Sequence, residues 1–268
     1  MSSASLWFKS CAPRQNATSQ LGKFAHLLKW KNYKETILDA GCGEGSITKE
    51  ILYPVVKNHS KKILSVDKSE VMINFAKKHN QVDHIDYQVM DVMDQAQVTK
   101  AANQFDHVFA IHLAQWIPNT RTLMTGFHKM LKADGQIFVL SFADLFLTHA
   151  FRKQFQEGKW RKYLPTDPVF ADYTSKPTQY IERLLNDIGF RLEGCNHEVQ
   201  MLYEENFTDF LRSCMSMYVY FARLPAELQE EYFEDILKLC HQSCNYLGPP
   251  DKYEMYYEPF TFVATKIK

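Results

Sequence analysis

Three glycines stand at alternate positions in the stretch ILDAGCGEGS, at residues 37–46. They are Gly41, Gly43 and Gly45, and the apolar run before them ends near Asp39. A glycine-rich turn between a strand and a helix commonly binds a nucleotide, because bare backbone can approach the ligand closely. A dinucleotide site has the spacing G-x-G-x-x-G, with a pyrophosphate at the helix N-terminus. The spacing here differs, so a ligand of another kind is indicated.

The charges in this loop favour a ligand that carries positive charge. Glu44 stands where a phosphate would lie, and a carboxylate there would repel it. S-adenosylmethionine instead carries an ammonium and a sulfonium group, and Asp39 could help to hold its amino-acid end. We expect Cys42 to be a small packing residue rather than a nucleophile, because no histidine lies near it in the sequence.

Acidic residues end two further predicted strands at the same edge of the sheet. Asp67 follows the run KILSV and could accept hydrogen bonds from both ribose hydroxyls, since a carboxylate has two oxygens. Asp91 follows IDYQVM and could accept a hydrogen bond from the adenine amino group, beside the backbone N–H of Val92. Two alternatives stay open. Asp67 could serve only to begin a helix, and Asp91 or Asp94 could serve only in a turn.

The elements that must position these residues alternate regularly in the first half of the chain. Apolar strands and amphipathic helices in turn are typical of a parallel α/β sheet. Pro177 begins a later helix that Gly189 ends. The class is therefore α/β, with a Rossmann-like, seven-stranded, mostly parallel sheet flanked by helices. The expected strands are 36–40, 62–67, 85–91, 105–111, 136–142, 190–204 and 259–268.

A helical insertion between the last two strands breaks the alternation. The stretch at about 205–252 is rich in aromatic residues and methionine, Phe207 and Phe210 among them, and predicts two helices separated near Pro225. Packing on the sheet could explain any one of these side chains, but together they suit a cap over a long apolar ligand. We expect one compact domain with three parts: the cofactor-binding core at 1–144, a cap part with the last core helix at 145–190, and the final strands with the insertion at 191–268.

Composition excludes several kinds of partner. The chain has 31 basic and 31 acidic residues, and the lysines are spread along it, so nucleic acid is not an expected partner. No run approaches the roughly 18 apolar residues of a membrane span, and the N-terminus has no signal-peptide pattern, which predicts a cytoplasmic protein with reduced cysteines. Cys240 and Cys244 lie one helical turn apart without a second ligand pair, so no metal is expected.

Several motifs together resemble a known enzyme family. ILDAGCGEGS, SVDKSEVMINFAKKH, VMDVMD and FDHVFAIHLAQWI are similar to the motifs of class I S-adenosylmethionine-dependent methyltransferases. More narrowly, LWFKSCAPRQ, LAQWIPN and IERLLNDIGF with the helical insertion resemble the insect juvenile hormone acid O-methyltransferases over most of the chain. The resemblance implies S-adenosyl-L-methionine as cofactor and methyl esterification of a small apolar carboxylic acid. The cofactor-binding residues that it implies are Asp39, Gly41, Cys42, Gly43, Asp67, Lys68, Met72, Asp91, Val92, Ile111 and His112.

The same resemblance implies that Trp116 and Gln15 hold the substrate carboxylate. An indole N–H and an amide are both donors and could fix one carboxylate oxygen in line with the methyl group. Gln20 is an alternative to Gln15, and Trp116 could instead be a core residue. No general base is needed, because a carboxylic acid with a pKa of about 4 to 5 is ionised at pH 7.

The expected substrate is juvenile hormone acid or farnesoic acid. The alternatives are another small carboxylic acid, or a lipid carrier that kept the fold without turnover. The aromatic insertion could also pair two copies of the chain into a homodimer.

Overall fold

The computed structural model describes residues 12–156, 159–164, 176–218 and 221–267. Within these residues a nine-stranded sheet forms the centre of the molecule. Its strands are β1 (Glu35–Ala40), β2 (Ser60–Asp67), β3 (Ile85–Val89), β4 (Phe105–Ile111), β5 (Leu131–Leu145), β6 (Phe190–His197), β7 (Gln200–Glu204), β8 (Asn245–Gly248) and β9 (Lys252–Lys266).

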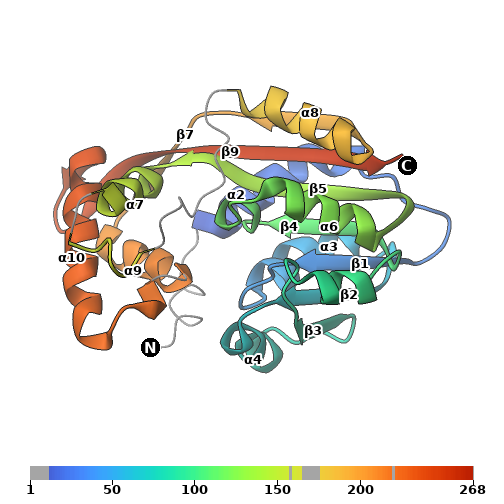
Figure 1. The fold of residues 1–268 in the computed structure, drawn as a ribbon, viewed down its shortest axis with the longest axis horizontal. Coiled ribbons are helices and arrows are strands. Elements are labelled where there is room, and N and C mark those ends of the chain that lie inside the picture. The colour runs from blue at the N-terminus through green and yellow to red at the C-terminus, as the bar shows by residue number, and fades with distance from the viewer. Residues whose placement is uncertain (1–11, 157–158, 165–175, 219–220, 268) are drawn as a thin grey trace.

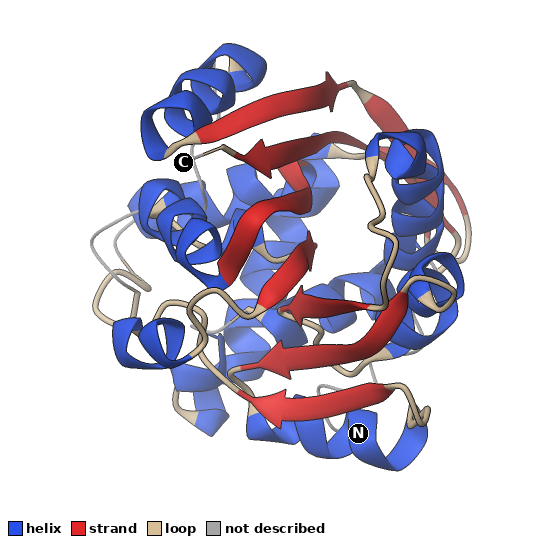
Figure 2. Ribbon diagram, turned by 90° about the vertical axis from the view of Figure 1, so that its right-hand side faces the viewer, coloured by secondary structure: helices blue, strands red, loops and turns tan. Residues whose placement is uncertain are grey.

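Seven of the strands follow the order β3-β2-β1-β4-β5-β9-β6. The pairs from β3 to β5 are parallel, whereas β9 runs antiparallel between β5 and β6. Helices cover both faces of this sheet (Figure 2). The prediction of a mostly parallel, Rossmann-like α/β sheet is therefore confirmed.

Two short strands extend the sheet beyond the predicted seven. The sequence alone predicts one strand over 190–204, but the chain divides it into β6 and β7, and β8 forms after the insertion. Both β7 and β8 pair with the first part of β9. Figure 1 shows β9 running from the cap helices to the C-terminal end of the core. This one strand thus joins the cap to the core.

The core helices begin and end at residues with clear local roles. Ser69 accepts a hydrogen bond from the N–H of Met72 and caps α4, and Asp94 caps α5 in the same way. Pro177 lies in the first turn of α8, which ends at Gly189 with a φ of 107°. The core helices are α2 (Ala12–Phe24), α3 (Tyr53–Val56), α4 (Glu70–His79), α5 (Gln95–Lys100), α6 (Thr120–Met130) and α8 (Pro177–Ile188).

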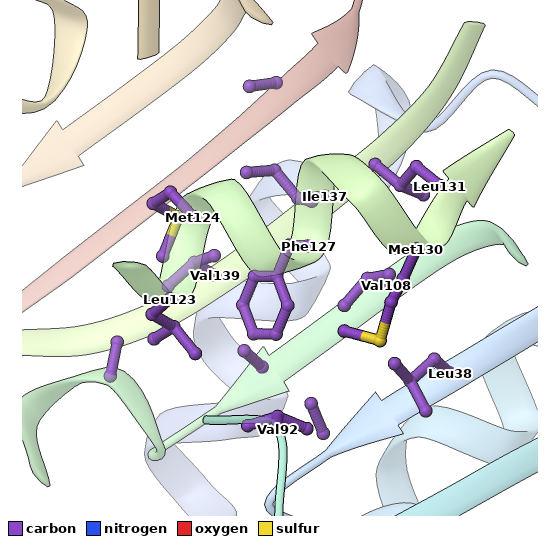
Figure 3. Packing of buried hydrophobic residues seen from close by; sticks show 14 of the residues in the cluster. Leu38, Val92, Val108, Leu123, Met124, Phe127, Met130, Leu131, Ile137 and Val139 are labelled. Carbon is purple, nitrogen blue, oxygen red and sulfur yellow. The ribbon is translucent and has the colours of Figure 1, made fainter. Parts of the chain in front are cut away.

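Packing of α6 against the middle strands makes a rigid support for the strand ends. Leu123, Phe127 and Met130 of α6 are fully buried and lie together with Val108 of β4 and Ile137 of β5 (Figure 3). Burying a side chain of this size stabilises the fold by roughly 1.5–3 kcal/mol relative to exposure. The packing therefore fixes the positions at which the loops after β1 and β4 begin.

The cap consists of α7 (Phe146–Gln156), α9 (Phe207–Met217) and α10 (Ala226–Ser243). The last two are the predicted pair of helices, and Pro225 immediately precedes α10. Buried Phe207 and Phe233 lie in a hydrophobic cluster of their own, separate from the core of the sheet. Figure 1 shows these helices at one end of the molecule, beyond the parallel strands. In the described part of the chain, no helix is both long and apolar enough to cross a membrane.

Candidate active site

A pocket lies where the order of the sheet reverses, between β1 and β4. Loops that leave two such strands diverge to opposite faces, and the crevice between them is the usual ligand site of an open α/β sheet. The pocket has a volume of about 980 Å³, including its open mouth. Gly43 and Thr48 line one end, and Phe146 and Phe210 of the cap line the other. One continuous space therefore connects the glycine loop with the cap.

The glycines of the loop have different roles. Gly43 has a φ of 56°, and a Cβ atom built on it would meet nothing within 4 Å, so bare backbone faces the hollow. Gly45 has a φ of 87°, and its Cβ would lie 2.8 Å from the hydroxyl of Tyr87. Gly45 is thus required for packing, whereas Gly43 lies where a ligand can approach the chain.

Asp67 connects the glycine loop to the start of α4. Its Oδ2 accepts a hydrogen bond from the N–H of Gly43 at 3.1 Å, and its Oδ1 accepts one from the N–H of Ser69 at 2.8 Å. Burial raises the pKa of this carboxyl above its usual range. Because each carboxylate oxygen has a second lone pair, Asp67 can still accept two hydroxyl hydrogen bonds.

Asp39 is the buried acid at the end of β1. Only 3% of it is exposed, and its Oδ2 accepts a hydrogen bond from Thr48 Oγ1 at 2.6 Å. Burial raises the pKa of Asp39 to about 6. A buried carboxylate is stabilised by an opposite charge nearby, so this position favours a cationic group in the pocket.

Glu44 has a structural role that the sequence did not indicate. Its carboxylate accepts hydrogen bonds from the N–H of Ser46 at 2.8 Å and from Nδ2 of Asn80 at 3.1 Å. The residue is buried, and burial raises its pKa. Glu44 lines the pocket, and its carboxylate also holds the loop against the end of α4.

His112 and Trp116 follow β4 on the other side of the pocket. The φ of His112 is 59°, its ring stacks on Phe142 with centroids 5.1 Å apart, and its Nε2 lies 3.2 Å from the carbonyl oxygen of Pro13. A carbonyl only accepts, so Nε2 carries the hydrogen. Burial lowers the pKa of His112 to about 4, and the ring is neutral near pH 7. Trp116 ends the 3-10 helix Ala114–Trp116 and is partly buried in the pocket wall.

Comparisons with known proteins find a methyltransferase domain in this chain and relatives along most of its length. Residues 38–139 match the family described as "Methyltransferase domain". Over 250 residues the chain is 24% identical to the juvenile hormone acid O-methyltransferase of Bombyx mori, covering 90% of this chain and 87% of that protein. The protein of the same name in Drosophila melanogaster is 22% identical over 257 residues, covering 94% and 86%. The chain therefore contains a methyltransferase domain and is an S-adenosylmethionine-dependent methyltransferase.

A solved structure shares the fold of this methyltransferase. Geranyl diphosphate methyltransferase in complex with S-adenosylmethionine superimposes with a TM-score of 0.51 at 11% identity, covering 93% of this chain and 85% of that one. At this level of identity the similarity concerns the fold alone.

The site of the methyltransferase fits S-adenosylmethionine. The open space beside Gly43 admits a ligand next to bare backbone, and Asp67 keeps a lone pair on each oxygen that would accept from the ribose hydroxyls. Asp39 would hold the amino-acid end through its buried negative charge. When bound, the cofactor supplies an electrophilic methyl group on its sulfonium.

The pocket brings together seven of the predicted site residues: Asp39, Gly41, Cys42, Gly43, Ile111, His112 and Trp116. Lys68 and Asp91 line a second hollow beyond the ends of β2 and β3, where Arg223 of the cap also lies. Asp67 lies between the two hollows, through its bonds to Gly43 and Ser69. Burial raises the pKa of the Cys42 thiol well above its usual value, so the thiol stays protonated.

Besides Asp67, three predicted site residues line neither hollow. Gln15 is exposed on α2, Met72 is buried on α4, and the side chain of Val92 is buried in the core under α6. The proposed alternative to Gln15 is already engaged, because Gln20 donates from Nε2 to Glu198 and accepts at Oε1 from Thr261. Neither glutamine lines the pocket, and their proposed contact with a substrate carboxylate stays a prediction.

Several pocket residues escaped the sequence-based prediction, and Asn16, Phe142 and Tyr257 are three of them. For Asn16 the sequence does contain a signal, namely the helical spacing of its apolar neighbours. Ala17 and Leu21 are buried on α2, and three-to-four spacing places Asn16 on their face of the helix. No comparable local signal marks Phe142 or Tyr257, because the neighbouring stretches 135–141 of β5 and 259–265 of β9 are buried on both faces of the sheet.

Replacing Gly43 by alanine is expected to weaken cofactor binding more than it weakens the fold. The added methyl group enters the hollow, and the positive φ costs roughly 1–2 kcal/mol. Gly45→Ala is the matched control, because its methyl group meets Tyr87 in the core and should mainly lower the melting temperature. Calorimetric titration with S-adenosylhomocysteine and thermal melts of both variants test this. Equal loss of cofactor affinity in both variants would contradict the distinction.

Proposed function

We propose that this methyltransferase is a carboxyl O-methyltransferase that esterifies a sesquiterpenoid acid, either juvenile hormone acid or farnesoic acid. The observation that carries the proposal is the continuity of the pocket. It runs from Gly43 and Asp39 to an end lined by Phe146, Leu147 and Phe210 of the cap. A long apolar chain suits that end, while its carboxylate would face the cofactor end. The names of the two insect relatives support the same substrate class.

The chemistry needs positioning and exclusion of water rather than a base. A carboxylic acid is ionised at pH 7, and neutral His112, with a pKa of about 4, is not suited to remove a proton. A carboxylate oxygen forms a bond to the methyl carbon while the methyl–sulfur bond breaks, and an ester and a thioether, both uncharged at the reacting centre, result. Bringing two opposite charges together out of water favours this outcome.

Trp116 is proposed to orient the acceptor. It lines the pocket between the glycine loop and the cap, and it packs against the cap cluster. The indole N–H can donate to a carboxylate oxygen and cannot accept, so it selects an anion over a donor group. The apolar cap then excludes water from the charged centre.

We expect Trp116→Phe to lower kcat/KM for the acid by roughly 10- to 100-fold, because a hydrogen bond to a charged group contributes about 1.5–3 kcal/mol. Affinity for S-adenosylhomocysteine should stay within twofold. Trp30→Phe is the matched control, since Trp30 stacks on His59 away from the pocket. Ester formation measured by mass spectrometry tests the pair. Unchanged turnover in Trp116→Phe would remove Trp116 from the acceptor site.

The function itself is tested by the choice of acceptor. The purified protein is incubated with S-adenosylmethionine and equimolar juvenile hormone acid, farnesoic acid and short fatty acids. Methyl esters of the sesquiterpenoid acids alone would support the proposal. Esters of all the acids would favour the alternative of a broad small-acid methyltransferase, and no ester with cofactor bound would favour a lipid carrier.

We also propose that the enzyme is cytoplasmic and that it can form a homodimer. Tyr203 of β7 and Tyr246 and Leu247 of β8 are exposed, and a second copy of the chain could cover exposed side chains of this kind. Light scattering across a concentration series measures the oligomeric state.

A further inference from the structure

An acidic residue of the cap lies on the face of β7 that lines the pocket. Glu204 is the last residue of this strand, in which Met201 and Tyr203 are exposed while Leu202 and Glu204 are partly buried. Successive side chains of a strand point to opposite faces, so Glu204 lies on the same face as Leu202. Leu202 lines the pocket. The carboxyl group of Glu204 therefore lies on the pocket side of β7, one strand repeat further along.

The pairing of β7 with β9 places this face against the interior of the cap. Leu202 lies opposite Met255, and Glu204 lies opposite Tyr253. Directly opposite residues of an antiparallel pair share one face, and both Met255 and Tyr253 are buried in the cap cluster. Cys214 of α9 also lines the pocket, and burial together with the nearby charge of Glu204 raises the pKa of its thiol to about 12. Glu204 is thus close to two residues of the pocket wall, Leu202 and Cys214.

No described residue offers the carboxyl group of Glu204 a hydrogen bond or an ion pair. Burial raises its pKa above the usual range, and no donor or positive charge opposes this shift. The next acid along the chain differs, because Glu205 is exposed and pairs with Lys252 at 2.9 Å. A partly buried acid without a partner destabilises the fold. An oxygen atom of a bound ligand could supply the partner.

The surroundings of Glu204 favour its protonated form when the pocket is filled. Leu147, Leu202 and Phe210 line the cap end of the pocket, where an apolar chain would displace water. Loss of water disfavours the charged form of a carboxyl group. In the protonated form Glu204 has one O–H donor. A hydrocarbon chain alone leaves this donor unpaired, whereas a chain with an oxygen atom at its end can accept from it.

We propose that Glu204 donates a hydrogen bond to an oxygen atom at the far end of the acceptor, and that the enzyme therefore prefers a sesquiterpenoid acid with a terminal epoxide. This inference rests on the proposed function, in which the carboxylate of the same acceptor lies at the cofactor end. An epoxide oxygen only accepts hydrogen bonds, so an O–H group is the matching donor. The acceptor is then recognised at both ends, by its charge at one and by its oxygen atom at the other.

The experiment compares two ligands that differ only at this end, namely farnesoic acid and the same acid with its terminal double bond epoxidised. Calorimetric titration measures the binding of each acid to the full chain saturated with S-adenosylhomocysteine. The wild type is expected to bind the epoxide acid roughly three- to tenfold more tightly, which one neutral hydrogen bond can supply. Glu204→Leu should lose this preference, at unchanged affinity for S-adenosylhomocysteine.

Glu204→Gln distinguishes hydrogen bonding from packing. The amide has nearly the same shape and keeps an N–H donor, so the preference for the epoxide acid should remain. Glu205→Gln is the matched control, because it makes the same chemical change at the exposed neighbour and should bind both acids as the wild type does. A purely structural role of Glu204 would lower the affinity for both acids in parallel and leave their ratio unchanged.

Two outcomes would overturn the assignment. One is a wild type that binds both acids with equal affinity. The other is a Glu204→Leu variant that keeps the wild-type ratio of the two affinities. Failure of the proposed function is distinguishable, because the wild type would then bind S-adenosylhomocysteine and neither acid, and both proposals would be wrong.

Discussion

Asp67→Ala is expected to weaken binding of S-adenosylmethionine by about 100-fold or more. The carboxylate is positioned by the N–H groups of Gly43 and Ser69, which leaves one lone pair on each oxygen directed toward a ligand. Two hydrogen bonds to a charged group contribute roughly 1.5–3 kcal/mol each, and 1.4 kcal/mol corresponds to a tenfold change in affinity. Removal of the carboxylate also frees the Gly43 end of the loop. Calorimetric titration with S-adenosylmethionine measures the effect.

Asp94→Ala is the matched control for Asp67→Ala. Asp94 is another acid that precedes a helix at this edge of the sheet, but it is exposed and accepts from the N–H groups of Ala96 and Gln97 as the cap of α5. Its removal should lower the free energy of unfolding by roughly 0.5–2 kcal/mol and leave cofactor affinity unchanged. An Asp67→Ala variant that bound the cofactor as the wild type does would exclude the ribose role.

The acids and glycines of the cofactor site were predictable because they depend on local sequence. A strand that ends in Asp67 and a helix capped by Ser69 force the carboxylate to the sheet edge, whatever lies elsewhere in the chain. The distinction between Gly43 and Gly45 was not predictable. It depends on Tyr87, which comes from β3 and reaches Gly45 only in the folded protein.

The acceptor side was harder to predict because it is assembled from distant segments. Gln15 and Asn16 are neighbours in sequence, but α2 turns the first outward and the second into the pocket. In the cap, Phe210 lines the pocket whereas Phe207 lies within the cap cluster, and both fall in one aromatic stretch. Tyr257 reaches the pocket because β9 is longer than its apolar pattern suggests and pairs with β5 and β7. Such contacts follow from tertiary packing rather than from local periodicity.

Asp39→Asn is expected to stabilise the protein without cofactor and to weaken cofactor binding at the same time. The pKa of Asp39 is about 6 in the folded protein, against an ordinary value of 3.8. The folded state therefore binds this proton more tightly than the unfolded state, and the contribution of Asp39 to stability falls as the pH rises from about 4 to about 6. Above pH 6 the buried charge costs about 3 kcal/mol, because 1.36 kcal/mol corresponds to one pKa unit. An amide of the same shape removes that cost and can still accept from Thr48.

The gain in stability should therefore depend on pH. We expect the melting temperature of Asp39→Asn to exceed that of the wild type by several degrees at pH 7.5, and the difference to vanish near pH 4. Cofactor affinity should fall by roughly 10- to 100-fold at pH 7.5, because the ammonium group loses an opposite charge. In the wild type, affinity should decrease as the pH falls below about 6, where Asp39 is protonated.

Asp106→Asn is expected to change the melting temperature in the opposite direction to Asp39→Asn. Asp106 lies at the start of β4, and hydrogen bonds and ion pairs with Lys31 and Lys132, together with the N–H of Thr36, hold its pKa well below the usual range. Its amide variant should melt lower at pH 7.5 and bind the cofactor normally. A lower melting temperature for Asp39→Asn at pH 7.5 would mean that the carboxylate is satisfied without a cation. The two variants together therefore distinguish Asp106, whose charge stabilises the folded protein, from Asp39, whose buried charge destabilises the protein until a cationic ligand binds.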